Sequence, residues 1–131
     1  MADWPAVQDA VSGLPPERCR RVALAAAKRA VDAWADHPAA LDAALVGASP
    51  GLRAEVQRLA EDLDDRYLDL HDDEKPGGQS PGWEAAFRRA RTAAAVVSAL
   101  DPDPNKAACG ALYEASYALD EDLTRLVPEV V

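Results

Sequence analysis

The chain has 131 residues, of which 49% are hydrophobic and 28% charged, and this composition is typical of one globular domain. Its 23 acidic residues outnumber 14 lysines and arginines and give a net charge of −9, which argues against nucleic acid or an anionic membrane as a direct partner. No apolar stretch approaches about 18 residues and no charged-then-apolar leader is present, so we expect a single cytoplasmic domain over residues 1–131 with neither membrane span nor secretory signal.

Prolines and capping residues divide the chain into six predicted helices. The predicted ranges are 5–12, 16–36, 38–47, 51–73, 82–100 and 104–127. A proline stands at or near the start of each range, as expected of a residue favoured in the first helical turn. The candidate N-caps are Asp3, Ser49, Ser80 and Asp103. Residues 75–82 (KPGGQSPG) are expected to form a flexible inter-helix loop because of their glycine and proline content.

Apolar residues recur at alternating steps of three and four in the four longest predicted helices, which is the spacing of one buried helix face. Alanine supplies much of the apolar content and aromatic residues only 5%, which favours helices packed closely across small side chains. Trp34 and Trp83 fall on these faces and are interpreted as core residues. No segment alternates as a strand requires. We therefore predict an all-α fold, an antiparallel bundle of four long helices with one or two shorter helices.

Residues that could carry catalysis are few. Cys19 and Cys109 belong to no CxxC or Cys/His cluster and are interpreted as buried thiols in a reducing cytoplasm, with a disulfide between their helices as the alternative. His37 precedes a proline between two predicted helices and is interpreted as a turn or cap residue, whereas His71 lies in an acidic run. No arrangement resembles a catalytic triad, so we predict no catalytic residue and no cofactor.

Eight of the 14 lysines and arginines are clustered on two of the predicted helices. They are Arg18, Arg20, Arg21, Lys28 and Arg29 on the second helix and Arg88, Arg89 and Arg91 on the fifth. We interpret them as solvated edges and inter-helix ion pairs. A phosphate site is an open alternative, although no glycine-rich loop accompanies these residues.

The most unusual segment is residues 61–74, which hold eight acids and one base. At about 100° per residue, five of its acids form a stripe opposite or beside the apolar face, namely Asp62, Asp65, Asp69, Asp72 and Asp73. Leu68 lies opposite the apolar face, among Glu61, Asp64, Asp65 and Asp72. An apolar residue ringed by acids has the composition of a small interface centre with a polar rim. The predicted partner-binding surface consists of Glu61, Asp62, Asp65, Leu68, Asp69, Asp72 and Asp73. A solvated helix face without a partner is the alternative.

The same acids also allow a metal site. Glu61, Asp62, Asp65 and Asp69 could offer oxygen ligands to Mg²⁺ on successive helical turns. Glu61-Asp62-x-x-Asp65 is similar to the first half of the Glu-Glu-x-x-Glu and Glu-x-x-Asp pattern of all-α nucleoside-triphosphate pyrophosphatases, but the second half has no counterpart on the next helix. This similarity implies a Mg²⁺-dependent phosphohydrolase as the alternative function.

Four alanine-rich stretches carry a second resemblance. They are residues 20–34 (beginning RRVALAAAKRA), 38–45 (PAALDAAL), 90–95 (ARTAAA) and 112–118 (LYEASYA). In these stretches the chain resembles small α-helical immunity proteins of bacterial polymorphic toxin systems. The resemblance implies an acidic helical bundle that binds a cognate toxin and blocks its active site. The expected function is therefore a non-catalytic inhibitor of a basic protein partner, with a homodimer through the alanine-rich faces as a further possibility.

Overall fold

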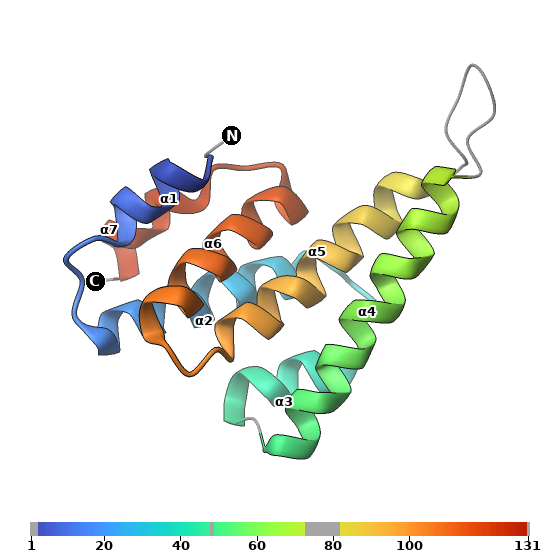
Figure 1. The fold of residues 1–131 in the computed structure, drawn as a ribbon, viewed down its shortest axis with the longest axis horizontal. Helices are drawn as coiled ribbons and strands as arrows, with labels where there is room; N and C mark the ends of the chain where they lie inside the picture. Colours follow the sequence, from blue (N-terminus) through green and yellow to red (C-terminus); the bar gives the residue numbers. More distant parts are fainter. Residues whose placement is uncertain (1–2, 48, 73–81, 131) are drawn as a thin grey trace.

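The computed structural model describes residues 3–47, 49–72 and 82–130, and these ranges contain helices and no strand (Figure 1). The elements are α1 (Trp4–Val11), α2 (Pro16–Asp32), α3 (Ala39–Gly47), α4 (Pro50–Asp72), α5 (Trp83–Ala99), α6 (Pro104–Leu119), the 3-10 turn η1 (Leu123–Arg125) and α7 (Leu126–Val130). The predicted all-α class is confirmed. Within the same ranges no helix is long and apolar enough to cross a membrane. The predicted loop at 75–82 lies outside the described residues apart from Gly82, which precedes α5.

Several helices begin where their capping residues predict. The Asp3 carboxylate accepts a hydrogen bond from the Ala6 amide at 2.9 Å, and the Asp103 carboxylate caps the first turn of α6 in the same way. Ser49 Oγ accepts from the Leu52 amide at 3.2 Å at the start of α4. Each cap satisfies amide groups that have no partner inside the helix. Ser80 lies outside the described residues.

The centre of the fold is formed by α2, α5 and α6, each of which packs against the other two. Their buried residues are mostly alanines, which allow the helix axes to approach closely. Where α5 meets α6, a Cβ atom added to Gly110 would lie 2.8 Å from both Cβ and Oγ of Ser98. The contact therefore requires glycine at this position, because real Cβ atoms do not approach other atoms so closely.

The predicted bundle of four long helices is realised only in part. Helix α4 lies along α5 at one edge of the molecule, with α3 against its N-terminal half (Figure 1). Val56 is the fully buried α4 residue in the main core, and Leu52 and Leu59 pack against that core. One long side of α4 therefore faces away from the other helices.

Two predicted helices end earlier than expected. The second ends at Asp32 rather than at residue 36, and Trp34 lies in the turn that follows, where it is half-buried and packs against the main core. The last one is interrupted at Asp120, which adopts a left-handed conformation with φ of 53°. Asp tolerates this conformation, and the acids of residues 120–122 oppose the negative end of a helix dipole. The chain then turns, and Leu123 lies in η1 and not in a continuation of α6; its side chain is buried.

Both cysteines are buried and neither forms a disulfide. Burial raises the pKa of Cys19 and of Cys109 above the ordinary thiol value, so both are held in the neutral form. The interpretation as buried thiols is therefore confirmed, and the alternative of an inter-helix disulfide is not found in the structure.

Candidate functional site

Five of the seven predicted partner-binding residues lie together on the side of α4 that faces solvent. They are Glu61, Asp62, Asp65, Leu68 and Asp69, all exposed, and we refer to them as the outer acidic face. Asp65 follows the buried Val56 by nine residues, which at about 100° per residue places it on the opposite side of the helix. Asp72 ends α4, but its side chain and the whole of Asp73 lie outside the described part of the chain.

Leu68 is the apolar member of this face, and half of its surface, 50%, is exposed. Of the four acids expected around it, Glu61 and Asp65 are exposed on the same side of α4, and Asp64 is paired with Arg91 instead. The side chain of Asp72 lies outside the described part of the chain. Large aliphatic side chains are usually withdrawn from water, and full burial of a leucine contributes roughly 2 kcal/mol. Covering Leu68 with a partner would recover part of that free energy.

The carboxylates of the outer acidic face have few interactions with the rest of the chain. Glu61 Oε1 accepts a hydrogen bond from Gln57 Nε2 at 3.3 Å. Within the part of the chain that the structure describes, Asp62, Asp65 and Asp69 form no ion pair and no side-chain hydrogen bond. Asp65 and Asp69 are also one turn apart, where like charges repel. Among the described residues these three carboxylates therefore carry their charge without an ion pair, although Arg58 and Arg66 stand one helical turn from Asp62.

Asp64 has a different role from the one expected of it. The sequence places it in the ring around Leu68, but the structure pairs it with Arg91 of α5. The other end of the Arg91 guanidinium donates to Glu114 Oε2 of α6 at 2.7 Å. The Arg91 side chain is only 21% exposed, and its guanidinium carbon lies 5.8 Å from the Phe87 ring centroid. This ion-pair bridge joins α4, α5 and α6.

Burial and charge act against each other in this bridge. Burial alone would lower the pKa of Arg91, but Glu114 and Asp64 outweigh burial, and the pKa is raised. Burial raises the pKa of Glu114 even though Arg91 acts in the opposite direction. Arg91 therefore stays charged, and Glu114 depends on it for compensation. The predicted inter-helix ion pair is confirmed for Arg91.

An aromatic cluster holds the C-terminal half of α4 against α5. The ring centroids of Tyr67 and Phe87 are 5.1 Å apart with an edge-to-face geometry, and the centroid of Trp83 lies 6.2 Å from that of Tyr67. All three side chains are half-buried and lie outside the main core, so Trp83 packs in this cluster instead of the expected central core. The cluster and the Arg91 bridge together fix the inner side of α4, which leaves the outer acidic face on a supported helix.

The structure places no cluster of metal-ligating side chains, among the residues it describes, where the alternative function would need a Mg²⁺ ion. In residues 3–47, 49–72 and 82–130, no group of three or more His, Cys, Asp or Glu side chains is placed to hold a metal ion. Glu61, Asp62, Asp65 and Asp69 are spread over the outer side of α4 instead of converging. The metal site remains a prediction from the sequence.

His37 occupies the turn between α2 and α3. Its Nδ1 lies 2.7 Å from the Trp34 carbonyl oxygen and its Nε2 lies 2.6 Å from Asp42 Oδ2. Both hydrogen bonds raise the pKa of His37, and the bond to the Trp34 carbonyl contributes more than the bond to Asp42. Both ring nitrogens are engaged in joining two helices, which confirms the interpretation as a turn residue. The side chain of His71 lies outside the described part of the chain.

Comparison of the chain with protein-family models, with curated protein sequences and with solved structures finds no match.

Proposed function

We propose that the protein is a non-catalytic binding protein that docks a basic protein partner on its outer acidic face. The observation that supports this most is the set of four exposed carboxylates on the same helix face as the half-exposed Leu68, three of which form no ion pair and no side-chain hydrogen bond among the described residues. The inner side of the same helix is anchored by a buried arginine and an aromatic cluster. A charged face on a supported helix needs little rearrangement to bind, which lowers the cost of association.

The arrangement fits an interface with an apolar centre and a charged rim. Leu68 supplies a side chain whose burial in an interface is favourable, and Asp65 and Glu61 lie one and two helical turns before it on the same side of α4. Residues 61–69 span only about 12 Å of helix, whereas a stable interface covers roughly 800 Å² on each partner. The outer acidic face is therefore proposed as the centre of a wider contact.

An inhibitor of a basic enzyme is the kind of function that this surface suits. Enzymes that act on nucleic acids carry positive surfaces because their substrates are anionic. A carboxylate-rich helix competes for such a surface and accelerates association through long-range attraction. The resemblance to helical immunity proteins implies the same role, and the buried, neutral thiols suit a reducing cytoplasm. We therefore propose a cytoplasmic, immunity-like inhibitor.

The proposal is tested by capture from a lysate of the native host at low and moderate salt. The immobilised baits are the wild type and the Asp65→Lys/Asp69→Lys variant. We expect the wild type to capture a basic protein in a salt-sensitive manner, and the variant to lose it. The captured protein should also lose enzymatic activity when the wild-type chain is added in stoichiometric amount.

A matched variant separates the surface from overall charge. Asp9→Lys/Glu129→Lys changes exposed acids on α1 and α7, away from α4. Because each replacement adds two charges, both double variants raise the net charge from −9 to −5. The control should capture the partner as the wild type does. Equal loss from both variants, or no salt-sensitive basic protein at all, would contradict the proposal.

A further inference from the structure

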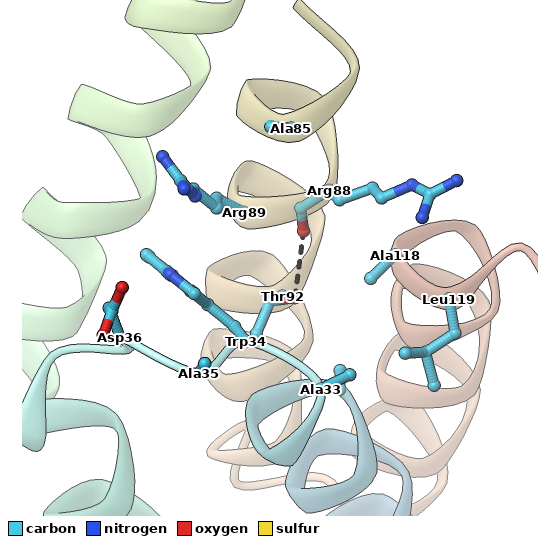
Figure 2. Close-up of a pocket in the computed structure, with 11 residues that line it drawn as sticks. Ala33, Trp34, Ala35, Asp36, Ala85, Arg88, Arg89, Thr92, Ala118 and Leu119 are labelled. Carbon is cyan, nitrogen blue, oxygen red and sulfur yellow. Dashed lines mark hydrogen bonds between the residues drawn. The ribbon is translucent and has the colours of Figure 1, made fainter. Parts of the chain in front are cut away.

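A hollow of about 330 Å³ lies where the end of α2 meets α5 and the end of α6 (Figure 2). Its walls come from the turn after α2, from one side of α5 and from the last residues of α6. Many of the lining residues are alanines, among them Ala33, Ala85 and Ala118, and these short side chains leave the space open. The volume is at the lower end of the range for small-molecule pockets, enough for one aromatic ring with a substituent.

Trp34 and two arginines give this hollow a specific chemistry. The guanidinium carbon of Arg89 lies 5.6 Å from the centroid of the Trp34 indole. Figure 2 shows Arg88 leaving α5 in the opposite direction to Arg89 and ending beyond Ala118, over the end of α6, and both arginines line the hollow. Both arginine side chains therefore border the same space, one beside an aromatic wall and one beside the end of α6.

Neither arginine forms an ion pair with a carboxylate of the described residues. Arg91, on the same helix, forms two ion pairs, whereas Arg88 and Arg89 form none among the described residues. Asp36 also lines the hollow but makes no ion pair with either of them. In a chain with 23 acids and 14 lysines and arginines, this hollow is lined by two arginines and one acid, Asp36, so its lining carries a net positive charge. A guanidinium stacked on an indole keeps its N–H donors at the edge available to an anion.

We infer that this hollow binds a small aromatic anion, an aryl carboxylate or an aryl phosphate. The anionic group accepts hydrogen bonds from Arg89, with Arg88 adding positive charge from the opposite side. The ring of the ligand lies against Trp34 and the alanine-lined wall. Both parts are needed, because guanidinium groups recognise planar oxyanions and the apolar wall favours a ring over a hydrated ion.

The site is tested by nuclear magnetic resonance on the ¹⁵N-labelled full chain, following the indole N–H signal of Trp34, assigned with Trp34→Phe. The probes are benzoate, phenyl phosphate, inorganic phosphate and benzyl alcohol. We expect benzoate or phenyl phosphate to shift this signal saturably, with a dissociation constant on the order of a millimolar for so small a ligand. Inorganic phosphate and benzyl alcohol should bind at least about tenfold more weakly. The stronger of the two aromatic anions identifies the preferred oxyanion.

Two variants and a matched control locate the binding. Arg89→Gln should weaken the aromatic anion about tenfold, since it removes the charged hydrogen-bond donor. Ala85→Glu should do the same by placing a carboxylate in the hollow while leaving both arginines in place. The matched control is Arg21→Gln on α2: Arg21 is exposed and forms no ion pair with any residue that the structure describes, so the change removes the same charge and should leave binding unchanged.

Three results would overturn the inference. The first is the absence of a saturable shift with either aromatic anion. The second is binding of benzyl alcohol or of inorganic phosphate as tight as that of the aromatic anions. Tight binding of benzyl alcohol would mean that the arginines contribute nothing, and tight binding of inorganic phosphate would mean that Trp34 and the apolar wall contribute nothing. The third is equal weakening by Arg89→Gln and Arg21→Gln, which would mean attraction to overall charge rather than to this hollow.

Discussion

Asp64 and Asp65 are adjacent in the acidic run, yet they belong to two different regions of α4. Asp64 lies on the inner edge, where Arg91 pairs with it and with Glu114. Asp65 lies on the outer face, exposed and without an ion pair among the described residues. The comparison shows that one run of like charge can serve two purposes. The inner acid joins helices, and the outer acids are left for the solvent or for a partner.

The two regions differ because of what lies opposite them. A half-buried arginine that lacks carboxylate partners is costly, so Asp64 and Glu114 offset a desolvation penalty that Arg91 would otherwise carry. In the part of the chain that the structure describes, no cation forms an ion pair with Asp62, Asp65 or Asp69, and water stabilises their charges instead. Changes on the inner edge should therefore affect folding, and changes on the outer face should affect binding.

Arg91→Met should have the largest effect on stability. It leaves the acids of two helices facing one another without the cation between them. Breaking a fully buried pair costs 3–5 kcal/mol, and because Asp64 is 41% exposed we expect a loss of about 2–3 kcal/mol. Urea unfolding followed by circular dichroism measures the change.

The control for this variant is Arg89→Met, two residues earlier on the same helix. Arg89 is exposed, and its guanidinium carbon lies 5.6 Å from the centroid of the Trp34 indole. Its replacement should therefore lower the free energy of unfolding by less than about 1 kcal/mol. Equal losses from the two variants would mean that the bridge contributes nothing beyond the helix itself.

Lowering the pH should reduce the effect of Arg91→Met. Burial raises the pKa of Glu114, so the folded chain binds this proton more tightly than the unfolded chain does. Stability from this group therefore falls as the pH rises through the window above its ordinary pKa. Removing Arg91 removes the charge that opposes the shift, so the variant should lose less stability relative to wild type at pH 5 than at pH 7. If the difference in stability between wild type and Arg91→Met were the same at pH 5 and pH 7, this account of Glu114 would be contradicted.

Asp64→Asn should lower the free energy of unfolding by about 1 kcal/mol. This is less than the effect of Arg91→Met, because Glu114 still pairs with the arginine. Asp65→Asn is the matched control, with the same chemical change one residue further on, and should leave stability within about 0.5 kcal/mol of wild type. Parallel thermal unfolding of the two variants compares the inner edge with the outer face directly. A larger loss at Asp65 would reverse the assignment of the two regions.

Asp65→Asn/Asp69→Asn should have the smallest effect, and its sign should be favourable. The two residues are one helical turn apart and repel each other, and they lie in the half of α4 nearer the negative end of its dipole. We expect stability to rise by a few tenths of a kcal/mol at low salt and to return towards wild type at high salt. A clear loss of stability would show that these acids hold the fold together.

Much of this arrangement follows from the sequence. Prolines and caps such as Asp103 predict the helix starts, since both act within a single turn. Helical periodicity also predicts that Asp65 and Leu68 face away from Val56, because that relation depends on one helix alone. Each of these features depends on residues within one helix, so capping preferences and helical periodicity are enough to predict them.

The features that depend on contacts between helices could not be predicted in the same way. The pairing of Asp64 with Arg91 requires knowing which helix lies along α4 and at what rotation. The bundle prediction placed α4 in a common core, but close packing of α2, α5 and α6 across alanines leaves it at the edge. The hollow beside Trp34 arises because α2 ends at Asp32, a few residues before its helical pattern stops.

The central claim is that the outer acidic face receives a basic partner, and the association rate constant of the captured partner tests it most directly. The rate should be measured across a range of salt concentrations for the wild type, for Asp65→Lys/Asp69→Lys and for Asp9→Lys/Glu129→Lys. We predict that reversal on α4 slows association by about tenfold at low salt, that salt removes most of this difference, and that the control follows the wild type. Identical rates for wild type and the α4 variant at every salt concentration would contradict the claim.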